Sequence, residues 1–379
     1  MSEEKKLSEE ELIEKYSYVD WDELSRSEHL SEAFIEKHVD EVNWCLISKY
    51  QHPSEEFMEE HAENVDWDYI SKYQHLTEPF INKHADKVDW LEISKYQKLS
   101  ENFIDKHADK VYWTRISEYQ KLSENFIEKH AEDVNWGFIS ANQTLSKAFI
   151  EIHSNEVNWH LISGCQNLGE NFIEKHAKDV DWFFISKDQK LSEAFIEMHT
   201  EDVDWDNISE CQNLTESFIE KHAEDVNWSF ISANQTLSKA FIEKHSNEVN
   251  WNLISECQKL SEDFIEKYAD KVNWECISTY QKLNEEFIEK YVAKVDWERI
   301  STYQHLSEDF IKKHIDKINV EIIASRPEYR KEFIDELREL RHDNKNKIIN
   351  DTKLPTNVVS PQDRSGILDK VVNKEELKR

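Results

Sequence analysis

The chain has 379 residues, of which 38% are hydrophobic, and its 79 acidic against 47 basic residues give a formal net charge of −32 at pH 7. This acidity disfavours direct binding to a nucleic-acid backbone or to an anionic membrane, because both require a positive protein surface. The four glycines and five prolines are too few for sheets joined by many turns, so we expect an all-α protein.

All thirteen tryptophans share one spacing of 23 residues, from Trp21 to Trp297, without insertion or deletion. A fixed period of this length is typical of a stacked repeat array, in which each unit leaves apolar faces that its neighbours cover. The sequence therefore predicts an α-solenoid (superhelix) of about 13–14 two-helix repeats, capped at both ends.

The N-terminal end is predicted over residues 1–29, as a charged stretch followed by an atypical capping repeat. Glu11 stands where the regular repeats have Phe, which suits a face turned to solvent. The first residues, MSEEKKLSEEE, lack the apolar run of a secretory signal peptide. The regular repeats are predicted over residues 30–325.

Each regular repeat is predicted to contain two short helices, here called helix A and helix B. In the repeat Leu122–Thr144, LSENFIEKHAEDVNWGFISANQT, Ser123 suits the N-cap of helix A, which is predicted to run about to Asp133. Asn135 suits the N-cap of helix B, which is predicted to end near Gln143. Helices this short are marginal alone, so packing between repeats must supply their stability.

The pattern breaks at Val320, where the next Trp would fall. Residues 326–341 are predicted to form a C-terminal capping helix. Residues 342–379 are polar and contain Pro355 and Pro361, so they are predicted to be a disordered tail. From residue 326 onward there are 13 basic and 11 acidic residues, which leaves 34 basic and 68 acidic residues in the preceding part. The acidity therefore belongs to the repeats.

Three polar residues recur within the apolar faces. A histidine lies six residues before Trp in most repeats, a serine lies four after every Trp, and a glutamine lies seven after nearly every Trp. Equivalent histidines are one layer apart, about 9–10 Å, and cannot share a zinc ion whose ligands lie ~2 Å from it. Tyr268 and Tyr291 replace histidine in two repeats, which a buried hydrogen-bonding role tolerates. We interpret these residues as scaffold that bonds backbone groups between layers.

The sequence predicts no catalytic, cofactor-binding or metal-binding residue. No Gly-rich phosphate loop, nucleophile elbow or clustered metal motif is found, so we do not expect an enzyme. The five cysteines form no CxxC pair, and Cys165, Cys211 and Cys257 lie two repeats apart, on the order of 20 Å. This is too far for disulfides, so we expect free thiols and an intracellular, cytoplasmic location.

The positions two and six residues after Trp differ between copies and share one flank of helix B. In the central repeats they carry apolar and small residues, which is what a partner-binding groove requires. One alternative is that small residues only make room for bulky ones in ordinary packing. Another is duplication, because ISANQTLSKAFIE occurs at 139–151 and again at 231–243. The candidate partner-binding residues are Phe138, Asn142, Leu161, Cys165, Phe184, Asp188, Asn207, Cys211, Phe230, Asn234, Leu253 and Cys257.

The unit LSExFIEKHxxxVxWxxISxxQ resembles the short Trp-containing helical repeats found in proteins of giant DNA viruses of protists. The resemblance covers residues 7–325 and implies a tandem-repeat protein of a host cell or virion, with no functional residues to transfer. We expect a non-enzymatic scaffold that binds an unidentified host or viral protein along the helix-B flank, without direct contact with nucleic acid or membrane. The alternative is an acidic mimic of nucleic acid that occupies basic DNA- or RNA-binding proteins.

Overall fold

The computed structural model describes residues 20–27 and 29–351, with side chains described as far as His342. This part of the chain contains 28 helices and no strand, which confirms the predicted all-α class. It divides into two compact units, Met1–Gln212 and Asn213–Arg379, and each is described by itself.

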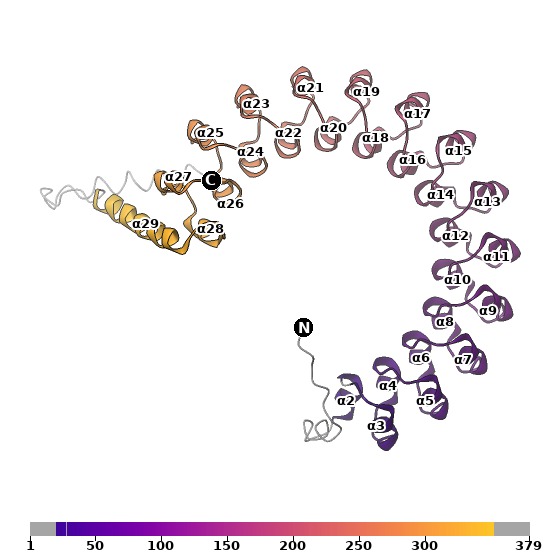
Figure 1. Cartoon of the computed structure of the whole chain (residues 1–379). Coiled ribbons are helices and arrows are strands. Elements are labelled where there is room, and N and C mark those ends of the chain that lie inside the picture. Colours follow the sequence, from indigo (N-terminus) through magenta and orange to yellow (C-terminus); the bar gives the residue numbers. More distant parts are fainter. Residues whose placement is uncertain (1–19, 28, 352–379) are drawn as a thin grey trace, which may run out of the picture. The chain divides into compact units, whose positions relative to one another are not determined.

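Two kinds of helix alternate along both units (Figure 1). The A helices have six residues and begin with Glu or Lys, whereas the B helices have seven or six residues and begin with Trp, or with Val in the last one. The A helices of the first unit are α3 (Glu32–Lys37), α5 (Glu55–Glu60), α7 (Glu78–Lys83), α9 (Glu101–Lys106), α11 (Glu124–Lys129), α13 (Lys147–Ile152), α15 (Glu170–Lys175) and α17 (Glu193–Met198). Its B helices are α2 (Trp21–Ser27), α4 (Trp44–Tyr50), α6 (Trp67–Tyr73), α8 (Trp90–Tyr96), α10 (Trp113–Tyr119), α12 (Trp136–Asn142), α14 (Trp159–Cys165), α16 (Trp182–Asp188) and α18 (Trp205–Cys211).

The second unit continues the same alternation and ends in one long helix. Its A helices are α19 (Glu216–Lys221), α21 (Lys239–Lys244), α23 (Glu262–Lys267), α25 (Glu285–Lys290) and α27 (Glu308–Lys313). Its B helices are α20 (Trp228–Asn234), α22 (Trp251–Cys257), α24 (Trp274–Tyr280), α26 (Trp297–Tyr303) and α28 (Val320–Ser325), followed by α29 (Lys331–Asp351). Within each unit the repeats therefore stack as a solenoid of two-helix layers.

The predicted caps form as expected. Ser123 Oγ accepts the backbone N–H of Phe126, and Asn135 Oδ1 accepts that of Phe138. The predicted end of helix A at Asp133 is wrong, because α11 ends at Lys129. His130 leaves the helical region, with φ −114° and ψ 31°, and residues 130–133 form turns.

The B helices of neighbouring repeats pack directly against one another, whereas the A helices form a second, more widely spaced row (Figure 1). Between the rows lie the buried side chains of each repeat, such as Phe126, Ile127, Val134 and Ile139. Burying one such Ile or Phe contributes about 1.5–3 kcal/mol. The same Phe, Ile, Val and Ile positions are buried in nearly every repeat, so a single core pattern is repeated along each unit.

The tryptophans are only half-buried and connect one repeat to the next. The Trp136 ring stacks on Phe149, with ring centroids 6.2 Å apart, and lies 4.7 Å from the ring of His153. Both partners belong to the following A helix or its C-cap. Aromatic pairs of this kind contribute about 0.5–1.5 kcal/mol beyond their burial. Equivalent trios recur along the array, which explains why Trp is kept at this position.

The serine of each B helix forms one hydrogen bond to the N-terminus of the next B helix and one within its own helix. Ser140 Oγ accepts the backbone N–H of Asn158 at 2.9 Å and donates to the carbonyl of Trp136 at 2.6 Å. Ser140 is fully buried. Without its hydroxyl, both backbone groups would lose a hydrogen-bond partner that water cannot replace, because water does not reach them. The predicted scaffold role of serine is confirmed.

The glutamine after each B helix holds the turn of the preceding repeat. Gln166 Nε2 donates to the carbonyls of Ser140 and Gln143, at 2.9 and 2.7 Å, and its Oε1 accepts the N–H of Leu145 at 3.1 Å. One buried amide thus satisfies three backbone groups of the neighbouring layer. The predicted role of glutamine between layers is also confirmed.

Most of the described histidines bond a carboxylate, although Nε2 of His38, His84 and His176 has no hydrogen-bond partner. The prediction that the histidines bond backbone groups through their rings is wrong. His153 Nε2 lies 2.5 Å from Glu128 Oε2, in the preceding A helix. The sequence missed this pairing because the two residues are 25 positions apart. In one repeat the carboxylate is absent: Asn82 takes its place and accepts a hydrogen bond from Lys106, and His107 Nε2 has no partner. Burial, and then the nearby lysines, lower the pKa of His107.

The C-terminal end replaces the glutamine with an arginine. Pro327 stands at the glutamine position, and Arg326 Nη1 donates to the carbonyls of Ser301 and Gln304 at 2.9 and 2.8 Å. The next helix, α29, contacts α27 and α28 and buries Phe333, Ile334 and Leu337. It continues to Asp351, ten residues past the predicted boundary at 341. The remainder of the predicted tail, 352–379, and residues 1–19 of the predicted N-terminal end lie outside the described residues.

Replacing Gln166 with Leu should lower the free energy of unfolding by about 3 kcal/mol, because buried backbone groups of the preceding turn lose their partner. Denaturation with urea, followed by tryptophan fluorescence, measures this loss. The neighbouring Asn167→Leu is the control, since Asn167 is exposed and its loss should change stability by less than about 0.5 kcal/mol. Equal effects of the two changes would contradict the role assigned to the glutamine.

Replacing Asn82 with Glu should make the protein less sensitive to acid. In the native chain the lowered pKa of His107 means that the unfolded state binds more protons below about pH 6.5, so stability falls with pH. The introduced carboxylate restores the arrangement of the next repeat, where Asp105 contacts both Lys129 and His130. His107 can then be protonated in the folded state, which reduces the loss of stability as the pH falls.

Melting temperatures of the wild type and Asn82→Glu at about pH 7.5 and pH 5.5 measure the difference, with Asn155→Glu as a control for added charge. Asn155 is exposed in a turn. The expected result is a smaller drop in melting temperature for Asn82→Glu alone. An unchanged drop would show that His107 does not limit stability in acid.

Candidate partner-binding surface

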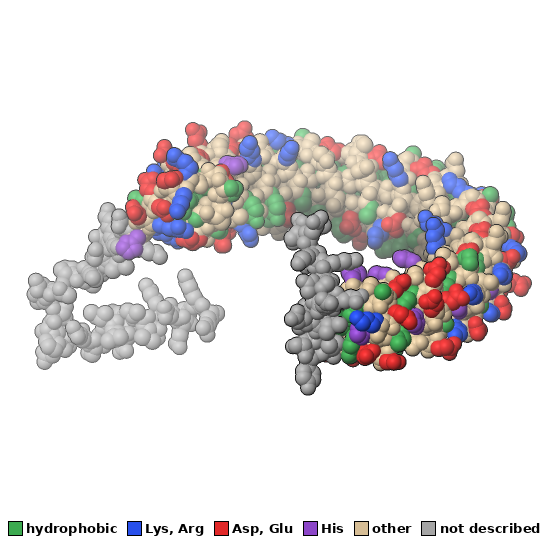
Figure 2. Space-filling model, turned by 60° about the horizontal axis from the view of Figure 1, so that its bottom comes forward, with side chains coloured by type: hydrophobic (Ala, Val, Ile, Leu, Met, Phe, Trp, Pro, Cys, Tyr) green, Lys and Arg blue, Asp and Glu red, His purple; other side chains and the backbone are tan. Residues whose placement is uncertain are grey.

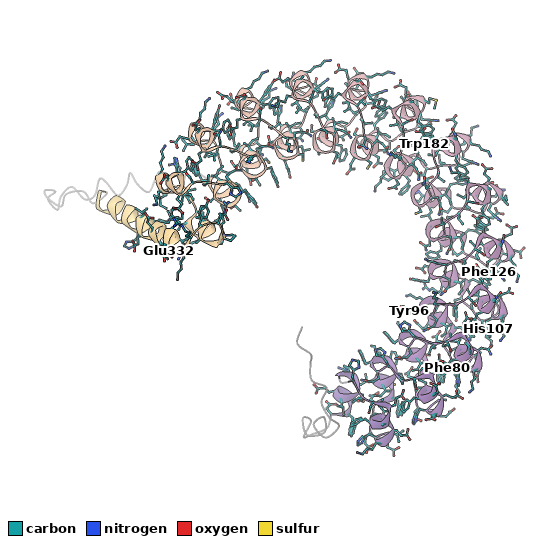
Figure 3. All side chains as sticks on the ribbon, in the orientation of Figure 1. Phe80, Tyr96, His107, Phe126, Trp182 and Glu332 are labelled. Atoms are coloured by element: carbon teal, nitrogen blue, oxygen red, sulfur yellow. The ribbon has the colours of Figure 1, made fainter. Side chains whose placement is uncertain are left out.

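The exposed side of the B helices carries the residues that the stacking does not use. Figure 3 shows Tyr96 on the side of α8 that faces away from the A helices, whereas His107 and Phe126 lie on the side of the A helices. The residues two and six positions after Trp, which we call the flank, lie on this exposed side. In the first unit, Phe138, Leu161 and Phe184 are half-buried there.

One open depression lies on the flank of the first unit. It has a volume of about 440 Å³ and is lined by residues of α10, α12 and α14 and the N-cap of α12: Glu118, Asn135, Gly137, Phe138, Ala141, Asn142 and Leu161. Four of these, Gly137, Phe138, Ala141 and Asn142, lie in α12 outside the buried core positions of the repeat Leu122–Thr144. The structure therefore brings together Phe138, Asn142 and Leu161 from the predicted set.

The lining of this depression combines a hydrophobic floor with polar groups at its edge. Gly137 lies close to the N-cap, because a Cβ there would lie 3.1 Å from Asn135 Oδ1. Asn142 Nδ2 donates to the carbonyl of Glu118 at 3.2 Å. Burial raises the pKa of Glu118, but hydrogen bonds from Arg115 and Tyr119 outweigh it, so the net shift is downward and this edge is anionic at neutral pH.

Phe184 is held by packing instead of lining the depression. A Cβ on Gly164 of the preceding B helix would lie 3.0 Å from the Phe184 ring. His160 meets the same ring edge-on, with centroids 4.4 Å apart. Here a small residue makes room for a bulky one, as the packing alternative expects. The small residue is five positions after Trp, one before the position considered in the sequence.

The other predicted residues of the first unit lie apart from the depression. Asn207 is buried, with 7% of its surface exposed, and its Nδ2 lies 3.5 Å from the carbonyl of Phe183, so it offers little to a partner. Cys165, Asp188 and Cys211 are exposed. Burial, and then the Glu210 carboxylate, raise the pKa of Cys211, which keeps it a thiol at neutral pH.

In the second unit the predicted residues follow the same arrangement. Phe230 and Leu253 are half-buried, and Asn234 and Cys257 are exposed. A smaller depression of about 230 Å³ lies nearer the C-terminal end of this unit, lined by Glu256, Glu275, Cys276, Thr279, Tyr280, Arg299 and Tyr303. Arg299 forms an ion pair with Glu275 at 2.9 Å across its edge. None of its lining residues belongs to the predicted set.

The sequence reasoning missed the lysines beside the tyrosines of the first unit. Lys49, Lys72 and Lys95 each lie five residues after Trp, directly before the flank tyrosine of the same helix. Each ammonium lies near the ring of its own tyrosine and that of the next repeat, within 5.5 Å of the centroids. The signal was present as Lys-Tyr in three successive repeats.

The remaining findings concern metal ions, membranes and similarity to known proteins. Among the residues that the structure describes, no group of three or more His, Cys, Asp or Glu is placed to hold a metal ion. None of the described helices has the length and apolar character that crossing a membrane requires. Comparison with models of known protein families, with curated proteins and with solved structures finds no match to this chain.

Proposed function

We propose that this chain is a non-enzymatic scaffold that binds a segment of another protein along the flank of its B helices. The observation that carries the proposal is the depression around Phe138. It gathers apolar positions that differ between the repeats, and it lies on a face where each neighbouring layer is fixed by hydrogen bonds. No catalytic group is needed for this role.

The chemistry of the depression suits a hydrophobic anchor from the partner. Phe138 and Leu161 supply apolar surface, and Asn142 and Glu118 lie beside them. Binding energy in protein interfaces concentrates in such apolar sites with a polar edge. A volume of about 440 Å³ is within the range of small ligand pockets and accommodates one or two side chains. The rigid frame also limits the entropy lost on binding.

The excess of acid favours a second candidate, an acidic mimic that occupies basic nucleic-acid-binding proteins. Two observations count against it. Figure 2 shows acidic and basic side chains interspersed over the face in view. Many carboxylates of the A helices also pair with a lysine of the next repeat, as Glu151 does with Lys175 and Glu220 with Lys244. Part of the acid is thus paired within the scaffold, and we rank partner binding at the flank first.

Replacing Phe138 with Ser should abolish binding of the partner without unfolding the chain, because the side chain is only half-buried. The measurement is affinity capture from the native cell with quantitative mass spectrometry, repeated with the purified partner. Phe183→Ser is the matched control, since Phe183 is 47% exposed and does not line the depression. A folded Phe138→Ser variant that binds its partner as well as the wild type would reject this site.

The same assay, repeated at increasing salt, separates the two candidates. Binding through a hydrophobic anchor should change little between about 0.1 and 0.5 M salt, whereas binding through the acidic surface should weaken steeply as charges are screened. A partner that is basic, is released by salt and is indifferent to Phe138→Ser would favour the acidic mimic.

A further inference from the structure

The B helices α4, α6, α8 and α10 carry a continuous row of alternating tyrosines and lysines, which we call the Tyr–Lys row. Its members are Tyr50, Lys49, Tyr73, Lys72, Tyr96, Lys95 and Tyr119. The ammonium of Lys49 lies 5.0 Å from the centroid of Tyr50 and 5.5 Å from that of Tyr73. The ammonium of Lys95 lies 4.8 and 5.3 Å from those of Tyr96 and Tyr119.

The row offers hydrogen-bond donors and positive charge beside its aromatic rings. Tyr73 and Tyr96 each have two lysine ammonium groups within 5.5 Å of the ring centroid, one from the preceding repeat and one from the same helix. Nucleobases bind aromatic side chains by stacking on an open face, and ammonium groups beside the rings favour carboxylates instead. The tyrosines are still 40–46% exposed. What remains available is a line of ammonium groups and tyrosine edges.

The charge of this surface is opposite to that of the rest of the repeats. The segments 45–52, 68–75, 91–98 and 114–121 contain six basic and three acidic residues, although the repeats overall contain two acidic residues for each basic one. Two of the three acids are paired there, Glu92 with Lys72 and Glu118 with Arg115. Hydrogen bonds that Lys49 and Lys95 donate to the hydroxyl oxygens of Tyr50 and Tyr96 raise the pKa of both lysines, so both stay cationic.

The spacing of the row indicates the form of an anionic partner. Because one lysine lies near two rings, consecutive tyrosines are no more than about 11 Å apart, close to the 8–10 Å between packed helices. A polyproline II chain advances about 3.1 Å per residue with three residues per turn, so every third side chain points the same way at about 9 Å intervals. One repeat of the solenoid therefore matches one turn of such a peptide.

We propose that the Tyr–Lys row binds an acidic peptide in the polyproline II conformation, with a carboxylate at every third residue facing successive lysines. This rests on the proposed function, since it names the chemistry of a partner of the same B-helix face. The Tyr–Lys row uses residues outside the depression around Phe138, so this proposal and the proposed function can fail separately.

Fluorescence anisotropy on the full chain tests the row with synthetic probes. The first is a labelled peptide of about twelve residues that repeats Glu-Pro-Ala, and the second has the same composition with its glutamates grouped at one end. The first should bind at least about tenfold more tightly, and Lys49→Gln, Lys72→Gln and Lys95→Gln together should remove at least about tenfold of that affinity. Added salt should weaken the binding.

The matched control removes the same charge elsewhere in the first unit, by Lys178→Gln, Lys187→Gln and Lys190→Gln. Lys187 occupies the same position of its repeat as Lys49, but Asp188 follows it in place of tyrosine. This variant should bind within about twofold of the wild type. Thermal unfolding checks that both triple variants are folded.

Equal binding of the two peptides, or binding that the first triple variant leaves unchanged, overturns the proposal. Tighter lysine-dependent binding of a single-stranded oligothymidine of similar length also overturns it in favour of nucleic acid. Phe138→Ser should bind the Glu-Pro-Ala peptide normally. If that variant loses its cellular partner while no peptide binds the row, only the present inference fails.

Discussion

The hydrogen bonds of the glutamine side chain are the constraint on which the rest of the structure depends. The end of each B helix and the turn after it expose backbone groups toward the next layer, where water does not reach them. Gln166 and its equivalents satisfy two carbonyls and one N–H of that turn at once. An inserted or deleted residue would move the amide away from all three groups. The constant 23-residue period follows from this requirement, and Arg326 meets the same need where the glutamine is replaced by Pro327.

Much of the fold could be predicted because its determinants are local or strictly periodic. The period, the N-caps Ser123 and Asn135 and the roles of serine and glutamine depend on residue type and spacing alone. The early end of the A helix could not be predicted in the same way. His130 leaves the helix where its ring lies 4.6 Å from Trp113 of the preceding B helix and its nitrogen reaches Asp105. Both partners lie far away in sequence, and neither has a signal in the helix itself.

The candidate site shows the same division between local and non-local information. Divergence between copies identified Phe138 and Asn142 as free positions, and the structure collects them in one depression. The divergence between copies could not show that Asn207 is buried or that Phe184 packs against Gly164. The size of a side chain in the adjacent repeat decides how exposed a residue is. The Tyr–Lys row was missed for a related reason. Each position was compared down the array by itself, whereas the contact joins the lysine of one repeat to the tyrosine of the next.

Under the proposed function, the two rows of helices divide structure from recognition within each unit. In the A row, charged side chains form ion pairs between repeats, such as Lys129 and His130 with Asp105. In the B row, serine and glutamine already hold the layers together with neutral groups, so its outer positions are free to vary. The B helices also pack more closely than the A helices, which brings exposed side chains of successive repeats close to one another. Small features of single repeats therefore join into continuous surfaces on the B row, and we expect a partner that spans several repeats to bind there.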